Sequence, residues 1–429
     1  MEKTYYPQWN ETVYRQVQPS GLTVCVVPRP GFTKKLAYFV TDFGAIHTEF
    51  QLNGQAVSAP AGIAHFLEHK MFDLPGRDVS EEFAALGAYP NAFTGYDMTA
   101  YYFSCTDHFD ACLRLLLEFV STGYFTEESV EKEQGIIGQE IGMSRDNPDH
   151  RIFELLMENM YPNHPIRIPI LGSRESIGKI TPEMLRACHR AFYRPDNMML
   201  CVVGDVDPQT VFTIAEEMIP KKSDDQVART DRWCEAMTPI RAFAQEQMEV
   251  AMPMFQLGFK CEDAGFGAEA IRQEAIGDLA CEALFGESSA LYMRLYEEGV
   301  IDGSFGGGFE TVDGMALVTA SGDSEQPETV KEAILQEAAR LVKEGLEETD
   351  FLRMKRSALG RRLRDLDSFD STCFRVCAYH FSGYDYFRFP EIYESVTQAD
   401  ILAFLQQVVT LDRCCMVTIY PKEVSNTCS

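Results

Sequence analysis

The chain lacks several features that mark exported, membrane-bound or nucleic-acid-binding proteins. No apolar run approaches the ~20 residues of a membrane span, and the first residues, Met1-Glu-Lys-Thr-Tyr-Tyr-Pro7, contain no apolar segment of a secretory signal. Its 13 cysteines include no Cys-x-x-Cys pair, which is typical of reduced thiols. Basic residues are few, 38 Lys and Arg against 65 Asp and Glu, and the net charge is −27. We therefore expect a cytoplasmic protein with no nucleic-acid and no membrane partner.

Histidine is also scarce, with 8 in 429 residues, yet two of the eight stand within one short segment, His65-Phe-Leu-Glu-His69. On a helix, His65, Glu68 and His69 leave the same face, because residues three and four apart are neighbours there. Two imidazoles one turn apart can hold one zinc ion, and a carboxylate between them can reach a water at the metal. This is the inverted form of the zinc-peptidase motif.

The alternative is a buried helix with two hydrogen-bonded histidines, and the flanking residues argue against it. At 100° per residue the small residues Ala61 and Gly62 share the histidine face together with Phe72. The other side is apolar, with Ile63, Phe66, Leu67 and Met71. We therefore predict a helix that is buried on its far side and approached closely by another element beside its polar trio, which a metal would satisfy.

Zinc usually takes three protein ligands, and a second predicted helix offers two candidates for the third. Thr126 is a plausible N-cap, and Asn147-Pro148 ends the segment. Glu133 and Glu140 lie two turns apart at the edge of an apolar stripe on this helix. Periodicity nominates both glutamates for a buried site and does not choose between them; a solvated acidic face is the alternative.

The chain resembles the pitrilysin/insulinase family of zinc metallopeptidases (inverzincins), which includes insulysin and the mitochondrial processing peptidases. Within that family it is most similar in form to the bacterial YmfH-like branch. The resemblance runs over nearly the whole chain. The segments that carry it, besides the histidine motif, are Ser20-Gly-Leu-Thr-Val24, Asn91-Ala-Phe-Thr94, Glu133 to Glu140, Gly172-Ser-Arg-Glu-Ser-Ile177, Tyr193-Arg-Pro-Asp-Asn-Met198, Val203-Gly-Asp-Val206 and Phe285-Gly-Glu-Ser-Ser289.

The resemblance implies roles for these residues. Zinc (Zn2+, one per chain) would be held by His65, His69 and Glu140, with Glu68 as the catalytic general base. Glu133 would be a supporting residue of the catalytic site that keeps it in order. An extended peptide substrate would add a strand beside Asn91, Ala92, Phe93 and Thr94. The expected activity is that of a zinc metalloendopeptidase, a hydrolase that cleaves unstructured peptides or processes leader peptides inside a closed chamber.

One part of the family pattern is missing. Family members carry an Arg and a Tyr in a Leu-Arg-Glu…Gly…Tyr stretch that contacts the substrate; here the segment reads Leu295-Tyr-Glu-Glu-Gly-Val-Ile-Asp-Gly-Ser-Phe305, with Tyr296 in place of the Arg. The resemblance implies a dimer, homo- or hetero-, and a related subunit would supply the missing pair. The alternatives are a weakly active or non-catalytic, structural peptide-binding subunit of a heterodimer and a non-proteolytic zinc hydrolase.

The predicted fold class is α+β, with two homologous domains that each pack helices on one side of a mainly antiparallel sheet. We predict an N-terminal zinc-binding domain over 1–220, a linker over 221–245, and a C-terminal domain of the same fold without a zinc site over 246–429. Predicted strands are 22–28, 37–43, 100–105, 199–203, 248–260, 304–310, 313–320 and 415–420. Predicted helices are 60–73, 80–87, 107–121, 127–144, 150–160, 181–192, 208–218, 267–283, 289–298, 327–344, 348–366 and 398–408.

Overall fold

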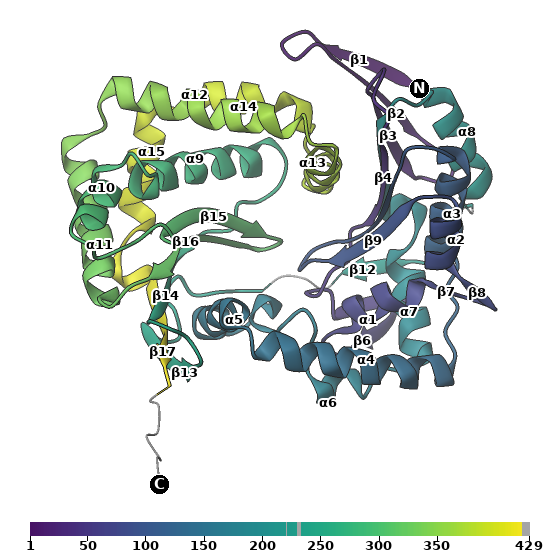
Figure 1. Cartoon of the computed structure of the whole chain (residues 1–429), viewed down its shortest axis with the longest axis horizontal. Helices are drawn as coiled ribbons and strands as arrows, with labels where there is room; N and C mark the ends of the chain where they lie inside the picture. Colours follow the sequence, from purple (N-terminus) through teal and green to yellow (C-terminus); the bar gives the residue numbers. More distant parts are fainter. Residues whose placement is uncertain (220, 230–232, 423–429) are drawn as a thin grey trace. The chain divides into compact units, whose positions relative to one another are not determined.

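The computed structural model describes residues 1–219, 221–229 and 233–422, and they form two compact units (Figure 1). Unit 1 comprises the described residues within Met1–Ile141, Pro169–Asp231 and Leu363–Phe387. Unit 2 comprises those within Gly142–Ile168, Arg232–Arg362 and Arg388–Ser429. The expected division at residues 220 and 246 therefore needs two corrections, because each half of the chain gives one helical segment to the unit built mainly from the other half.

Unit 1 contains a seven-stranded sheet in the order β1-β2-β3-β11-β4-β10-β9. All neighbouring strands are antiparallel except β3 and β11, which run parallel. The strands are β1 (Glu2–Tyr6), β2 (Glu11–Val17), β3 (Thr23–Pro28), β4 (Lys35–Thr41), β9 (Tyr89–Thr94), β10 (Thr99–Cys105) and β11 (Met198–Gly204). Two small sheets join β12 (Val227–Arg229), β5 (Glu49–Leu52) and β6 (Gln55–Ser58), and β7 (Asp73–Leu74) with β8 (Arg77–Asp78).

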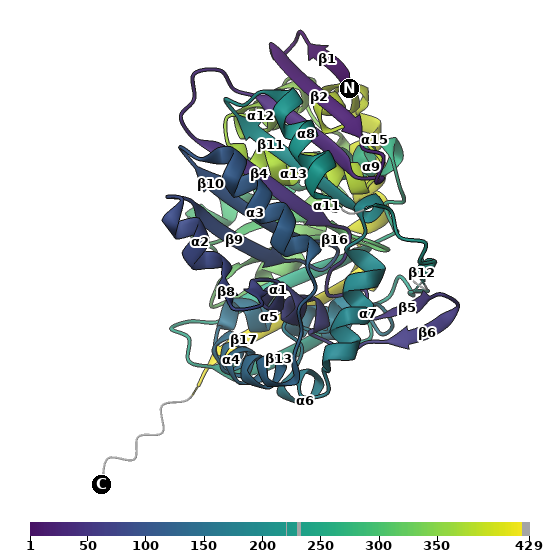
Figure 2. The same cartoon turned by 90° about the vertical axis from the view of Figure 1, so that its right-hand side faces the viewer.

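Helices cover both faces of this sheet, so its central strand β11 is buried at every position. One face, seen from the helical side in Figure 2, carries α3 (Phe109–Ser121) and α8 (Pro208–Met218) across the strands, with α1 (Ile63–Met71) beside β9. Helix α13 (Phe369–Phe381) packs against β11 and β4 on the other face (Figure 1). The remaining helices are α2 (Val79–Ala85), α4 (Glu127–Arg145), α6 (Arg174–Ile177) and α7 (Pro182–Phe192).

Unit 2 contains a five-stranded sheet in the order β13-β17-β14-β16-β15, with β13 and β17 parallel and the other pairs antiparallel. The strands are β13 (Phe243–Met248), β14 (Met254–Cys261), β15 (Gly306–Val312), β16 (Met315–Asp323) and β17 (Cys414–Pro421). Its helices are α5 (Pro148–Met160), α9 (Ala268–Phe285), α10 (Ala290–Glu297), α11 (Pro327–Glu344), α12 (Glu348–Asp365), α14 (Phe389–Ser395) and α15 (Gln398–Val408).

The two units repeat one topology. The strands β13, β14, β15, β16 and β17 have the order and directions of β3, β4, β9, β10 and β11. Helices α1 and α2 follow β4 as α9 and α10 follow β14, and α4 follows α3 as α12 follows α11. Helix α5 covers the unit 2 sheet through β13, β14 and β17, as α13 covers the sheet of unit 1. The predicted fold class, two similar α+β units with mainly antiparallel sheets, is confirmed. The expectation that helices pack on one side of the sheet was wrong for unit 1, where α13 lies on the face opposite α3 and α8.

Several local predictions were wrong. The strand expected over 248–260 is β14, which begins only at Met254; a separate strand, β13, ends at Met248. The helices α13 and α14 were not predicted. Residue 220, at the end of the expected N-terminal domain, and residues 230–232 of the expected linker lie outside the described residues. The linker also contains regular structure, because its strand β12 pairs with β5. Helix α1 begins at Ile63 and not at residue 60, because Gly62 has a left-handed conformation with φ of 90°.

The described cysteines are all free thiols, and Cys234 is the one among them that is exposed. In the described part of the chain, no helix combines the length and apolar character needed to cross a bilayer.

Candidate metal centre

A close approach of two backbones fixes the start of helix α1. Gly62 has a positive φ, and a Cβ there would lie 2.6 Å from the carbonyl oxygen of Leu171. Ser176 Oγ, on the following helix α6, donates a hydrogen bond of 2.8 Å to the carbonyl oxygen of Ala61. The small residues beside the histidine motif therefore admit another element, as the sequence predicts.

The apolar side of α1 anchors it in the core of unit 1. Ile63, Phe66, Leu67 and Met71 are all 1% exposed or less, and they belong to the hydrophobic cluster that includes the strands of the sheet. Burial of this side leaves the face with His65, Glu68 and His69 directed at the neighbouring helix α4 and strand β9.

Helix α4 brings the two candidate glutamates to this face. Thr126 and Ser129 exchange hydrogen bonds between side chain and backbone at its N-terminus, and the helix ends at Arg145, shortly before Asn147 caps α5. Val130, Ile137 and Ile141 are buried, so Glu133 and Glu140 lie at the edge of a packed stripe.

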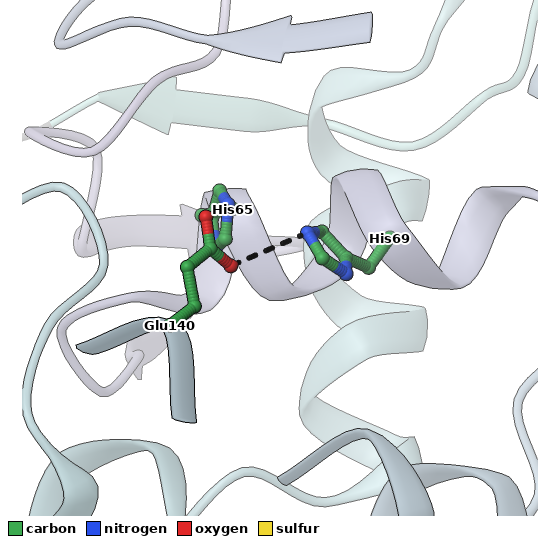
Figure 3. Close-up of side chains that lie close together, drawn as sticks. All are labelled: His65, His69 and Glu140. Carbon is green, nitrogen blue, oxygen red and sulfur yellow. Dashed lines mark ion pairs between the residues drawn. The ribbon is translucent and has the colours of Figure 1, made fainter. Parts of the chain in front are cut away.

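The structure brings His65, His69 and Glu140 together (Figure 3). Nε2 of His65 lies 3.6 Å from Oε1 of Glu140, and Nε2 of His69 lies 3.7 Å from Oε2 of the same carboxylate. One ligand atom from each of the three residues lies within 4.8 Å of the others. Among the described residues, this is the one group of histidine, cysteine and acidic side chains with such spacing.

The donor set fits zinc. Bonds of about 2.0–2.2 Å in a tetrahedral site place neighbouring ligand atoms roughly 3.3 Å apart, close to the distances seen here. Burial, followed by the nearby His69, lowers the pKa of His65 to about 4, so its imidazole is neutral near pH 7 and its Nε2 lone pair is available. The side chain of Glu140 is 38% exposed, so the position between the three ligand atoms is open to solvent on that side.

Glu133 does not face the same point as Glu140. Its Oε1 accepts a hydrogen bond of 2.9 Å from Nδ1 of His69, which leaves Nε2 of that ring directed at Glu140. Burial alone would raise the pKa of Glu133, but the hydrogen bond and charge of His69 outweigh it and lower that pKa. Burial alone would lower the pKa of His69, but the hydrogen bond and charge of Glu133 outweigh it and raise that pKa. A carboxylate behind a ligating histidine in this way fixes the ring and its tautomer.

Glu68 lies beside the trio and is 8% exposed. Its Oε2 accepts a hydrogen bond of 2.5 Å from Oγ1 of Thr94 on β9. Burial raises the pKa of Glu68, and the hydrogen bond from Thr94 opposes the rise. A buried, oriented carboxylate with a raised pKa has the properties of a general base.

Strand β9 holds Asn91, Ala92, Phe93 and Thr94 at the edge of the sheet. It pairs with β10 and is the last strand in the order, so within the described chain its outer edge has no strand partner. Side chains alternate along it: Thr94 reaches Glu68, while the ring of Phe93 lies 6.0 Å from that of Phe374 on α13. The edge is therefore geometrically able to accept an added strand.

Sequence patterns did not identify two contacts of this site. Thr94 was predicted only to lie beside the substrate, and the structure adds a hydrogen bond from its hydroxyl to Glu68. Lys70, 1% exposed, lies 3.8 Å from Oε2 of Glu133 through its Nζ atom. The sequence did contain a signal for Lys70, because a charged residue directly after the motif on an otherwise buried helix needs a partner.

Two family models match parts of the chain. The family described as insulinase (peptidase family M16) matches residues 55–174, and the family described as the peptidase M16 inactive domain matches residues 179–358. An uncharacterized zinc protease of Bacillus subtilis, YmfH, is 37% identical over 97% of this chain and 98% of its own length.

Solved structures give the same result. An M16-like peptidase from Alicyclobacillus acidocaldarius has a TM-score of 0.92 and 33% identity, covering 96% of this chain and 99% of that one. Pitrilysin, at 15% identity, shares the fold with a TM-score of 0.80; the match covers 98% of this chain and 46% of pitrilysin. On these matches, the chain belongs to peptidase family M16, the insulinase family.

Proposed function

We propose that this chain is a zinc-dependent endopeptidase that cleaves unstructured peptides. The observation that carries the proposal is the convergence of two imidazole Nε2 atoms and the Glu140 carboxylate within 4.8 Å, with buried Glu68 on the same helix face. The relative YmfH of Bacillus subtilis carries the name of an uncharacterized zinc protease, which supports zinc as the metal.

In this proposal His65, His69 and Glu140 hold one zinc ion. Zinc, when bound, supplies a Lewis acid that polarises a carbonyl and makes water more acidic. Glu68 accepts a proton from the attacking water and returns it to the departing amine. The hydrogen bond from Thr94 holds one carboxylate oxygen of Glu68, so the other oxygen is free to accept that proton.

The substrate lies along the outer edge of β9. Hydrogen bonds between main chains bind an extended peptide there with little dependence on its side chains. Folded proteins would not present such a free segment. The proposal therefore gives broad specificity for unfolded peptides, including leader peptides, within a closed chamber.

A second subunit completes the enzyme in this proposal. The segment Leu295–Phe305 has neither the Arg nor the Tyr that the family pattern places there, and Tyr296 is instead 54% exposed and stacked on Tyr292 at 5.8 Å. A related chain that carries the pair, in a dimer with this one, would supply it. The proposed location is the reducing cytoplasm. The cysteines that the structure describes are all free thiols, which supports this location.

The same missing pair favours a second candidate function. A chain that binds peptides at β9 but lacks the Arg and Tyr would be a weakly active or non-catalytic subunit. The match of residues 179–358 to a domain described as inactive is compatible with this alternative. The intact constellation of Glu68 and the three ligating side chains favours the enzyme.

Cleavage of a quenched, unstructured peptide by the zinc-loaded chain tests the proposal. Glu68→Gln should retain zinc and lower the rate by about 10²- to 10⁴-fold. Glu175→Gln, which changes an exposed glutamate, should cleave like the wild type. Glu68-dependent cleavage by the chain alone would make it self-sufficient and contradict the need for a second subunit. Zinc binding without cleavage would support a chain that needs the subunit carrying the Arg and Tyr. Absence of zinc binding in the wild type would contradict the enzyme and favour the structural, peptide-binding subunit.

A further inference from the structure

Lys70 is a fully buried cation directly behind the candidate metal centre. It follows His69 on α1 and is 1% exposed. Its Nζ contacts Oδ2 of Asp73 at the start of β7 and lies 3.8 Å from Oε2 of Glu133 on α4. A buried ammonium is costly unless it is paired, and these two carboxylates pair it.

We propose that Lys70 is a positioning residue for the metal centre: it fixes the carboxylate of Glu133 so that Glu133 orients His69 toward the metal. The inference rests on the proposed metal centre. The order of contacts is Asp73 to Lys70, Lys70 to one oxygen of Glu133, and the other oxygen of Glu133 to Nδ1 of His69.

The geometry gives Lys70 this effect because a carboxylate whose second oxygen is attracted by a nearby ammonium rotates less freely than one held at a single oxygen. With Lys70 in place, Oε2 of Glu133 lies within ion-pair distance of the ammonium, at 3.8 Å, and Oε1 lies 2.9 Å from Nδ1 of His69. The ring then presents Nε2 to the side where Glu140 lies. Without the lysine, the Glu133 side chain keeps a single partner in this contact series, and the ring orientation is less restricted.

A positive charge near a metal cation also repels it, and this repulsion opposes the orienting effect of Lys70. Asp73 is in direct contact with the ammonium, and a pair of opposite charges has a weak field at longer range. Two groups, Glu133 and the His69 ring, also separate Lys70 from the ligand atoms. The orienting effect therefore exceeds the repulsion, and loss of Lys70 weakens metal binding.

The test is zinc affinity of the full chain, measured by competition with a chromophoric chelator. Lys70→Met, which keeps the length of the side chain and removes its charge, should bind zinc about 10- to 100-fold more weakly than the wild type. Glu133→Gln should lose affinity as well, and adding Lys70→Met to Glu133→Gln should change affinity less than threefold, because the lysine acts through that glutamate. Lys70→Gln serves as a second variant if Lys70→Met does not fold.

Lys260 offers a matched control. It is 0% exposed and paired with Glu235 in unit 2, so Lys260→Met also removes a buried ammonium and should leave zinc affinity within twofold of wild type. A cobalt-substituted chain gives a second readout: the visible bands of bound Co2+ should shift in Lys70→Met and stay unchanged in Lys260→Met. Unchanged affinity and bands in Lys70→Met, or an equal loss in the Glu133→Gln background, would overturn the inference. A wild type that binds no zinc would overturn the metal centre itself.

Discussion

Two topologically equivalent pairs of helices, one in each unit, carry side chains of different chemistry. In unit 1, α1 and α4 bring together His65, His69 and Glu140. In unit 2 the helices at the same places in the topology, α9 and α12, bring together Glu274, Asp278 and Arg362. Glu274 and Asp278 have the spacing of the two histidines, and Nη2 of Arg362 lies 2.5 Å from the first and 3.1 Å from the second.

The difference lies in what satisfies each trio. The acids of α9 receive a guanidinium from α12, and Tyr393 also donates to Asp278 at 3.1 Å, so the unit 2 trio contains its own counter-charge. The unit 1 trio contains two imidazoles, which can be neutral, and one carboxylate. Their lone pairs converge, and the trio includes no Lys or Arg. One scaffold thus yields an ion pair in one unit and a set of metal ligands in the other.

The contact between helix and edge strand differs in the same way. Glu68 of α1 accepts the hydroxyl of Thr94 on edge strand β9. At the corresponding spacing, α9 has Gly277, and a Cβ there would lie 2.3 Å from Cγ of Phe309 on edge strand β15. In unit 2, the ring of Phe309 therefore packs against α9 at the place where unit 1 has the carboxylate of Glu68.

Removal of the cation in unit 2 should have the largest effect on stability. Arg362→Met leaves Glu274 and Asp278 without their guanidinium in a site where the arginine side chain is 9% exposed, and the free energy of unfolding should fall by about 3–5 kcal/mol. Denaturant unfolding measures this in a Trp9→Phe background, where Trp233 of unit 2 is the remaining tryptophan. Arg361→Met, at a 48% exposed side chain, should cost less than about 1 kcal/mol; an equal loss in both variants would contradict the buried triad.

A methyl group at Gly277 should test the packed contact of unit 2. Gly277→Ala forces the ring of Phe309 to move and should lower the free energy of unfolding by about 1–3 kcal/mol, less up to about 1 kcal/mol gained from helix propensity. The matched change is Gly360→Ala on α12, where a Cβ meets nothing within 4 Å, and it should stabilise. Thermal unfolding of both variants measures the difference, and stabilisation by both would mean that α9 and β15 pack less closely than described.

The hydrogen bond from Thr94 should have the smallest effect. Thr94→Val keeps the shape of the side chain and removes the donor to Glu68, so cleavage of a peptide should slow by about tenfold, from loss of a hydrogen bond to a charged group, at unchanged zinc affinity. Thr94→Ser keeps the hydroxyl and should restore most of the rate. If Thr94→Val instead raised KM alone, Thr94 would act in binding the peptide and not in orienting Glu68.

Sequence reasoning predicted the parts of the site that one element determines. The spacing of His65, Glu68 and His69 predicted their common face, because a single helix sets it. Periodicity could not choose between Glu133 and Glu140, since both lie at the edge of one stripe on α4. What separates them is which ring nitrogen of His69 each one faces, and that depends on the packing of two helices.

The fold shows the same limit. The two similar units and most of their strands and helices follow from local patterns, but the placement of α13 does not. Its buried residues, such as Phe369, Cys373 and Val376, have helical spacing, and Ser368 caps its start, so a helix could have been predicted there. That this helix covers the sheet of unit 1 depends on long-range contacts with β11 and β4, which no local pattern contains.

Zinc titration of the purified chain tests the central comparison most directly. We expect one equivalent of zinc, with affinity reduced more than 100-fold by Glu140→Gln, since a direct ligand matters at least as much as its supporting partners. Asp278→Asn, the matched change at the corresponding trio of unit 2, should leave zinc binding unchanged. Zinc binding that survives Glu140→Gln, or that is lost in Asp278→Asn, would contradict the assignment of metal binding to unit 1 and of the ion pair to unit 2.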